Sequence, residues 1–176
     1  CSGISSKPSN SSYTTASCTD CSGTKTINTG WTCDYGYYKN GSTCAANCHI
    51  YYSDGTSVSG PLISGKKAVG IVIGNLTVSI YDWGAAYSGT KSTSYYSRDG
   101  ISNWMTPTMA QINTIYNNKA EINRCMTLIG GTTLSETWYW TRDVKPNDIY
   151  VDEFHMTTKA TNLNSSTAYN HIRLVK

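Results

Sequence analysis

The first 48 residues of the chain have very few aliphatic side chains, and Ile4 and Ile27 are the only ones larger than alanine. A segment of that composition cannot bury a hydrophobic core of its own. The same stretch holds six of the seven cysteines, namely Cys1, Cys18, Cys21, Cys33, Cys44 and Cys48. We therefore expect disulfide bonds or a metal ion to keep this segment folded.

The spacing of these cysteines favours disulfides over zinc. Cys18 and Cys21 have the spacing of a zinc-ligand pair, but Cys33 and Cys44 come singly, and His49 is the only histidine near them. The chain is also rich in tyrosine, with 14, has a single phenylalanine, and only 14% of its residues are charged. That composition is typical of an exported bacterial surface protein, in which disulfides persist. We expect the six amino-terminal cysteines to form disulfides.

Cys125 lies far from the other cysteines in the sequence, and whether it is a free thiol depends on the role of Cys1. Two alternatives stay open for Cys1. The residues Cys1-Ser2-Gly3 resemble the start of a mature bacterial lipoprotein, in which the first cysteine carries a lipid anchor. That would leave six cysteines for three disulfides. Otherwise Cys1 pairs with another amino-terminal cysteine, and Cys125 stays a free, buried thiol.

Long hydrophobic runs and runs of basic residues are both lacking. The longest apolar run covers residues 68–73, far short of the roughly 20 residues that a membrane helix needs. The net charge of +3 is small and dispersed, with no run of lysine and arginine to focus it. We therefore expect no transmembrane segment and no nucleic-acid partner, and an extracellular or cell-surface location.

The composition changes near residue 49, which indicates two units over the 176 residues. We place a disulfide-rich module at residues 1–49 and a larger domain at residues 50–176. The phrase W-x-C-x-x-G-Y-Y-x-N-G-x-x-C at residues 31–44 resembles small growth-factor-like repeats of surface proteins. Within it, Asn40-Gly41 is a strong signal for a hairpin turn. Residues 1–17 have no periodicity, and we expect a partly extended leader there.

In the larger domain, apolar and alternating segments predict strands at residues 67–73 and 76–81, joined at Gly74-Asn75, and later at residues 138–142, 149–156 and 168–175. Turns are expected at residues 146–148 and 162–166. Residues 84–100 are small and polar, which predicts an irregular excursion.

Two helices are expected between these groups of strands. Thr108 and Gln111 have the spacing of a capping box directly after Pro107, and Asn118 and Glu121 repeat that spacing. Apolar residues recur at helical spacing after each box and indicate two buried faces. Gly130-Gly131 is expected to end the second helix.

The order of landmarks from Trp104 to the final residue resembles a bacterial C-type lectin-like domain. The matching pieces are W-x-T-P-T-x-x-Q-I at residues 104–112, Gly130-Gly131, W-Y-W-T at residues 138–141 and I-R-L-V at residues 172–175. Members of that family occur in collagen-like bacterial adhesins and as variable proteins of diversity-generating retroelements. The resemblance implies an α+β fold, a C-type lectin-like mixed sheet with one or two helices and with its first and last strands paired.

Catalytic and metal-binding patterns are missing from the sequence. The Glu-Pro-Asn and Trp-Asn-Asp motifs of calcium-dependent sugar lectins do not occur, and Asp152 and Glu153 would lie on opposite faces of a strand. His49, His155 and His171 are widely spaced, and no serine stands in a nucleophile-elbow motif. We therefore expect no metal, no cofactor and no enzymatic activity.

Loops that a rigid sheet presents are where recognition residues collect, and they lie here near residues 135–148 and 162–170. These segments and their flanks hold amphipathic side chains suited to binding, and the candidates are Trp138, Tyr139, Arg142, Tyr150 and Tyr169. The sequence thus predicts a secreted or cell-surface adhesin or ligand-binding protein that recognises a host or cell-surface protein or glycan. The alternative is a structural fimbrial or cell-envelope subunit that uses the same domain for assembly.

Overall fold

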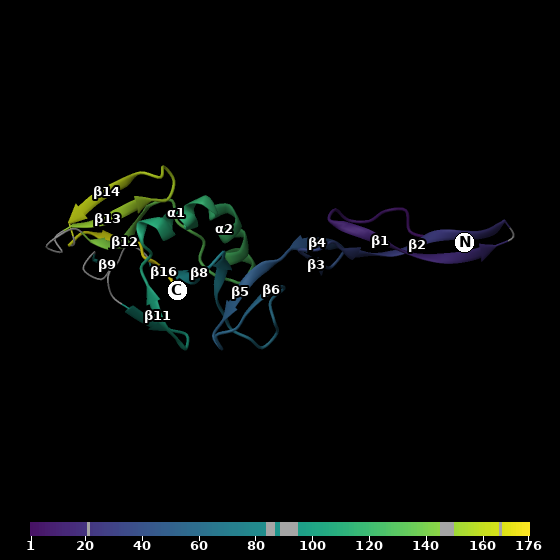
Figure 1. Ribbon diagram of the computed structural model, residues 1–176, viewed down its shortest axis with the longest axis horizontal. Coiled ribbons are helices and arrows are strands. Elements are labelled where there is room, and N and C mark those ends of the chain that lie inside the picture. The colour runs from purple at the N-terminus through teal and green to yellow at the C-terminus, as the bar shows by residue number, and fades with distance from the viewer. Residues whose placement is uncertain (21, 84–86, 89–94, 145–149, 166) are drawn as a thin grey trace. The chain divides into compact units, whose positions relative to one another are not determined.

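The structure of the chain is a computed structural model that describes every residue except 21, 84–86, 89–94, 145–149 and 166 (Figure 1). Strands hold 53% of the described residues, and two helices hold 12%. The expected α+β, C-type lectin-like mixed sheet is therefore wrong, because the chain is a mostly-β protein with several separate sheets. The two expected helices are present, but strands cover far more of the chain than the sequence indicated.

The chain divides into two compact units. One comprises Cys1–Cys48 with Ser59–Pro61, and the other comprises His49–Val58 with Leu62–Lys176. The sequence placed the change at residue 49. Each unit is described by itself below.

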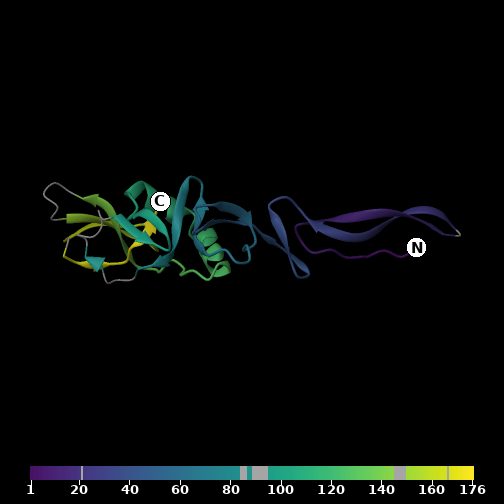
Figure 2. The same cartoon turned by 90° about the horizontal axis from the view of Figure 1, so that it is seen from below.

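The amino-terminal unit consists of two β-hairpins. Its strands β1 (Ser11–Asp20) and β2 (Gly23–Cys33) form a long antiparallel ribbon (Figures 1 and 2). The shorter strands β3 (Tyr37–Asn40) and β4 (Thr43–Ala46) confirm the hairpin expected at Asn40-Gly41. Gly41 has a φ of 58°, which glycine adopts without strain.

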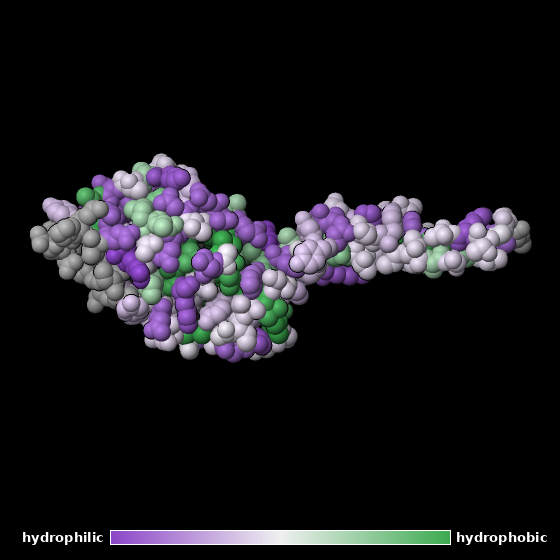
Figure 3. All heavy atoms as spheres, viewed as in Figure 1, coloured by the Kyte–Doolittle hydropathy of each residue, from purple (hydrophilic) through white to green (hydrophobic). Residues whose placement is uncertain are grey.

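Residues 11–17 lie in the leader that was expected to be partly extended, and they form part of the paired strand β1. Figure 3 shows this unit almost entirely in pale and hydrophilic colours on the face in view. A two-stranded hairpin without a hydrophobic core is only marginally stable in water. Covalent cross-links therefore stabilise this unit in place of a hydrophobic core.

Three disulfides are present. One joins Cys1 to Cys18 and one joins Cys33 to Cys44, while Cys48 and Cys125 are the other two disulfide-bonded cysteines. Of the two alternatives for Cys1, the structure therefore has the disulfide. The free thiol that this alternative gave to Cys125 is wrong, because Cys125 is disulfide-bonded. Only the tertiary fold brings a cysteine so distant in sequence to its partner.

Cys21, which was expected to form a disulfide, lies outside the described residues. It therefore remains a prediction.

Removing the Cys33–Cys44 disulfide is expected to destabilise the β3–β4 hairpin. The bond closes a loop with a sequence separation of 11 residues, and losing it is expected to cost about 3 kcal/mol in chain entropy. We expect the double variant Cys33→Ser/Cys44→Ser to lose amide-exchange protection over residues 37–46. The matched control is Cys1→Ser/Cys18→Ser, which should loosen β1 and β2 instead. Equal protection of residues 37–46 in the wild type and the first variant would refute this account.

The larger part of the second unit is built on a seven-stranded sheet in the order β10-β11-β16-β8-β7-β5-β6. Along the chain its strands are β5 (Cys48–Tyr52), β6 (Ser57–Gly60), β7 (Ala68–Ile73), β8 (Leu76–Asp82), β10 (Tyr95–Arg98), β11 (Ile101–Met105) and β16 (Arg173–Val175). The pair β7 and β8 confirms the two strands expected at residues 67–73 and 76–81. Gly74 turns the chain between them with a φ of 61°.

A three-stranded sheet follows, with the order β12 (Trp138–Val144), β13 (Tyr150–His155) and β14 (Thr161–Ser165). A small pair joins β9 (Tyr87–Ser88) to β15 (Tyr169–Asn170). Residues 162–166 were expected to be a turn, and this is wrong because residues 161–165 pair with β13 along their whole length. The turn expected at residues 146–148 lies outside the described residues, as does much of the excursion expected at residues 84–100.

The carboxy-terminal segment changes sheets. The single strand expected at residues 168–175 is instead β15 and β16, because His171 between them exchanges backbone hydrogen bonds with Trp138 and Trp140 of β12. The last strand, β16, then pairs with β8 and β11. The expected pairing of first and last strands is therefore wrong, since β5 lies beside β6 and β7.

The two helices are α1 (Met109–Asn117) and α2 (Lys119–Leu128). The first capping box is confirmed: Thr108 Oγ1 accepts from the Gln111 amide at 3.2 Å, and the Gln111 side chain accepts from the Thr108 amide at 2.8 Å. The second is wrong, because Asn118 makes no side-chain cap and donates its Nδ2 to the Thr114 carbonyl at 2.9 Å. Gly130, with a φ of 70°, follows the end of α2 as expected.

The core of this unit contains both indole rings of Trp104 and Trp140, each almost fully buried. They pack in one cluster with Val69, Ile101, Val151, Ile172 and Leu174. These residues come from both the seven-stranded and the three-stranded sheet. The cluster therefore joins the two sheets and supports the side chains that pack against it.

Candidate functional site

The residues that the sequence singled out for binding differ in how far they are exposed. Tyr139 is fully buried, so it does not reach a ligand at the surface. Trp138 is half-buried, with its ring edge against His155 at a centroid distance of 4.9 Å. Both side chains therefore have internal partners.

Of the other three predicted residues, two are exposed and one is half-buried. Arg142 is half-buried, and its guanidinium contacts the sulfur of Met105. Tyr150 on β13 is 51% exposed and Tyr169 on β15 is 64% exposed. Among the described residues, no hydrogen bond, ion pair or ring contact joins two members of the set. Their role in binding stays a prediction.

A different set of aromatic residues does gather, around Arg98. Tyr81 lies near the end of β8 and Trp83 follows two residues later, and both side chains line the same small hollow. Tyr96 and Arg98 are likewise two residues apart on β10. We call these four residues, Tyr81, Trp83, Tyr96 and Arg98, the Arg98 surface.

Ring stacking holds the Arg98 surface together. The guanidinium carbon of Arg98 lies 3.7 Å from the ring centroid of Tyr81 and 5.2 Å from that of Trp83. The Trp83 and Tyr96 rings meet edge to face, with centroids 4.9 Å apart. These are favourable cation–π and aromatic geometries. The four side chains therefore form a single assembled surface.

A tight turn and an ion pair lie at the edge of the Arg98 surface. Asp99 and Gly100 connect β10 to β11 with φ angles of 57° and 81°, as a two-residue hairpin turn with positive φ requires. Lys67 forms an ion pair and hydrogen bond with Asp99, which raises the pKa of Lys67. Asp99 is thus held between Lys67 on one side and Arg98 on the other.

The surface is anchored in the core beneath it. Trp83 and Tyr96 pack, partly buried, against the Trp104 cluster. A small hollow between Tyr81, Trp83, Arg98 and Asp99 has room for about one water-sized group. A larger ligand would therefore lie across the rings, which need little reordering to receive it.

Sequence reasoning missed this surface because residues 84–100 were taken as irregular. Two signals point to it. Asp99-Gly100 is a strong hairpin dipeptide. Tyr81 with Trp83, and Tyr96 with Arg98, also have the two-residue spacing of side chains on one face of a strand.

The opposite face of β8 carries a buried polar network centred on Asp82, whose side chain is 3% exposed. Asp82 accepts from the Tyr139 hydroxyl, lies 2.8 Å from Nδ1 of His171, and lies 3.6 Å from the Arg173 guanidinium. Arg173 also donates to the carbonyls of Ser79, Thr132 and Thr133.

Burial and the charge of Asp82 raise the pKa of the Tyr139 hydroxyl, which keeps it a donor. Burial lowers the pKa of Arg173, and Asp82 opposes that shift. The ordinary pKa of arginine is so high that Arg173 stays charged. The network joins β8, β12 and β16, which gives it a role in the fold.

A second buried carboxylate, Glu153 on β13, is 3% exposed. It accepts from Asn162 Nδ2 at 2.9 Å, from Asn164 Nδ2 at 3.1 Å, and from Asn170 Nδ2. The three amides come from β14 and β15, so this carboxylate holds those two strands against β13.

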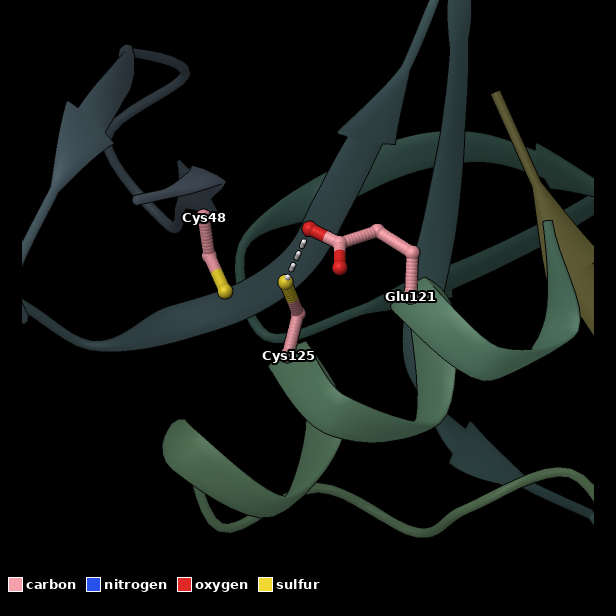
Figure 4. Close-up of side chains that lie close together, drawn as sticks. All are labelled: Cys48, Glu121 and Cys125. Carbon is pink, nitrogen blue, oxygen red and sulfur yellow. Dashed lines mark hydrogen bonds between the residues drawn. The ribbon is translucent and has the colours of Figure 1, made fainter. Parts of the chain in front are cut away.

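One group of candidate metal ligands was found among the described residues. It consists of Cys48, Glu121 and Cys125, whose ligand atoms all lie within 4.8 Å of one another (Figure 4). A cysteine binds a metal as the thiolate, but both of these cysteines are disulfide-bonded. The group therefore does not offer the thiolates of a metal site.

Comparison with known proteins adds no functional assignment. No protein-family model matches the chain, and no curated protein matches it in sequence. Neither of the described helices has the length and apolar character needed to cross a membrane. The Arg98 surface is therefore the main basis for a functional hypothesis.

Proposed function

We propose that this protein is an extracellular ligand-binding protein of the adhesin type, which contacts a glycan through the Arg98 surface. The observation that carries the proposal is the exposed guanidinium of Arg98 beside the rings of Tyr81 and Trp83, with the ring of Tyr96 against Trp83. Flat rings present apolar faces to the C–H groups of a sugar, and the neighbouring charged groups can hydrogen-bond its hydroxyls. Three disulfides fit an extracellular location.

The rigidity of the surface favours binding. Tyrosine and tryptophan give large contact areas at a low cost in conformational entropy. Here that cost is reduced further because Trp83 and Tyr96 already rest on the core. That the protein is not an enzyme stays a prediction.

Replacing Trp83 with alanine is expected to reduce glycan binding about tenfold or more, because it removes the central ring of the surface. Binding would be measured on a glycan array and then by titration calorimetry with the best ligand. Trp138→Ala is the matched control, since Trp138 is also half-buried but lies outside the surface. Thermal unfolding would establish that both variants are folded. Loss of binding in the Trp138 variant alone would place the site at the predicted loops instead.

The alternative function, a structural envelope or fimbrial subunit, has its own supporting observation. Strand β14 is at the edge of its sheet and contains neither lysine nor proline, two residues that commonly block edge pairing. Its Leu163 is also exposed. Sedimentation velocity across a concentration series tests this: polymers without any glycan binding would favour the structural role over the adhesin.

A further inference from the structure

We propose that Arg98 binds a carboxylate of the ligand, so that the glycan recognised by this surface contains an acidic sugar. The inference rests on the proposed function and names its ligand class. The Arg98 guanidinium lies beside two aromatic rings. That group is stacked on Tyr81 at 3.7 Å and is near Trp83 at 5.2 Å. Its orientation is therefore set before any ligand arrives.

The terminal nitrogens of Arg98 are available. An arginine has five N–H donors in a fixed fork. Nε of Arg98 lies 3.8 Å from Oδ2 of Asp99, and no hydrogen bond from Nη1 or Nη2 to an acceptor is found within the described part of the chain. The side chain of Arg98 is 43% exposed. A planar carboxylate can accept two parallel hydrogen bonds from such a fork.

The charge around the fork also favours an anion. Asp99 is the neighbouring acid, and its side chain is 14% exposed and flanked by Lys67 and Arg98. Two cations and one anion leave a local charge of one positive unit at the rim of the surface. An incoming carboxylate therefore meets net attraction, while Asp99 accepts from Lys67.

The aromatic rings beside the guanidinium indicate which kind of ligand bears the carboxylate. Trp83 and Tyr96 meet at 4.9 Å and extend the apolar contact away from Arg98. The hollow beside Arg98 takes only about one water-sized group. A sugar ring would lie over the aromatic side chains while its carboxylate reaches the guanidinium. A small inorganic anion would use the fork and leave the rings uncovered.

The test compares methyl β-D-glucuronide with methyl β-D-glucoside, which differ only in having a carboxylate or a hydroxymethyl group. Titration of the full chain, followed by the tryptophan indole N–H signals in NMR, should show the glucuronide binding about tenfold or more tightly. Its affinity should fall as salt is raised, since the contact is partly exposed. Equal affinity for the two glycosides would overturn the inference.

Three variants assign the effect to Arg98. Arg98→Gln should abolish the preference for the glucuronide, and Arg98→Lys should retain only part of it because lysine keeps the charge without the fork. Arg124→Lys is the matched control, since Arg124 lies on α2 with its side chain 37% exposed and paired with Glu121. A preference that survives in Arg98→Gln would refute the assignment.

Further measurements distinguish a failure of the carboxylate inference from a failure of the glycan-binding proposal. If array glycans bind, depend on Trp83, and show no preference for acidic sugars, the glycan-binding proposal stands and the carboxylate inference fails. Acetate, sulfate or phosphate binding as tightly as the glucuronide would show an anion site without sugar recognition, which also overturns it. An acidic peptide that displaces the glucuronide and binds more tightly would reassign the ligand to protein.

Discussion

Replacing Asp82 with alanine is expected to lower the free energy of unfolding of the carboxy-terminal unit by about 3–5 kcal/mol. The carboxylate is buried and is the negative charge beside Arg173, whose own side chain is fully buried. Removing it leaves that guanidinium without its counter-charge in a low-dielectric interior. The Tyr139 hydroxyl and the His171 ring would lose a partner at the same time.

The measurement is chemical denaturation followed by intrinsic fluorescence. Asp54→Ala is the matched control, since Asp54 pairs with Lys66 at 2.6 Å on the surface, where an ion pair contributes little. The double variant Asp82→Ala/Arg173→Met should recover part of the loss, because it removes the unpaired charge as well. If Asp82→Ala is no worse than Asp54→Ala, the network does not hold the sheet together.

Replacing Glu153 with alanine is expected to cost about 2–4 kcal/mol and to loosen β14 and β15 selectively. Three asparagine amides converge on this carboxylate, and each would lose a charged acceptor in a site that is 3% exposed. The cost is limited because the change also removes a buried charge, whose desolvation opposes folding. Glu153→Gln should be intermediate, since it keeps one acceptor oxygen.

Hydrogen exchange checks this second expectation directly. Amides at residues 161–165 should lose protection in Glu153→Ala, while those of α1 and β7 should change little. Glu136→Ala is the control, because Glu136 is an exposed partner of Lys119. A uniform loss of protection across the unit would show that Glu153 supports the whole fold and not the attachment of these strands alone.

Some features of the fold follow from short stretches of sequence. The cap of α1 needs only Thr108 and Gln111, three residues apart, and the β7–β8 hairpin needs only two apolar strands around Gly74. The hairpin at Gly41 is of the same kind. Each of these depends on contacts between neighbours in the chain, and local propensity was therefore sufficient to predict them.

Segments with weak local preferences were misread. The run of Asn and Ser at residues 162–166 has turn composition, yet β14 forms because Asn162 and Asn164 place their amides on Glu153. The capping role expected of Asn118 was lost because its side chain binds the preceding helix. In both cases a polar side chain can form more than one hydrogen bond, and the composition of the segment did not show which one it makes.

The sequence by itself determined the cysteine-dependent character of the amino-terminal unit, the two helices and several hairpins. Only the tertiary structure decided that Cys125 is oxidised, that the chain is mostly β, and that β16 lies between β8 and β11. It alone brought Arg98 of β10 over Tyr81 of β8. These outcomes depend on pairings between residues far apart in sequence. These long-range pairings are stabilised by the joint burial of side chains and by charge compensation, which short sequence patterns do not reveal.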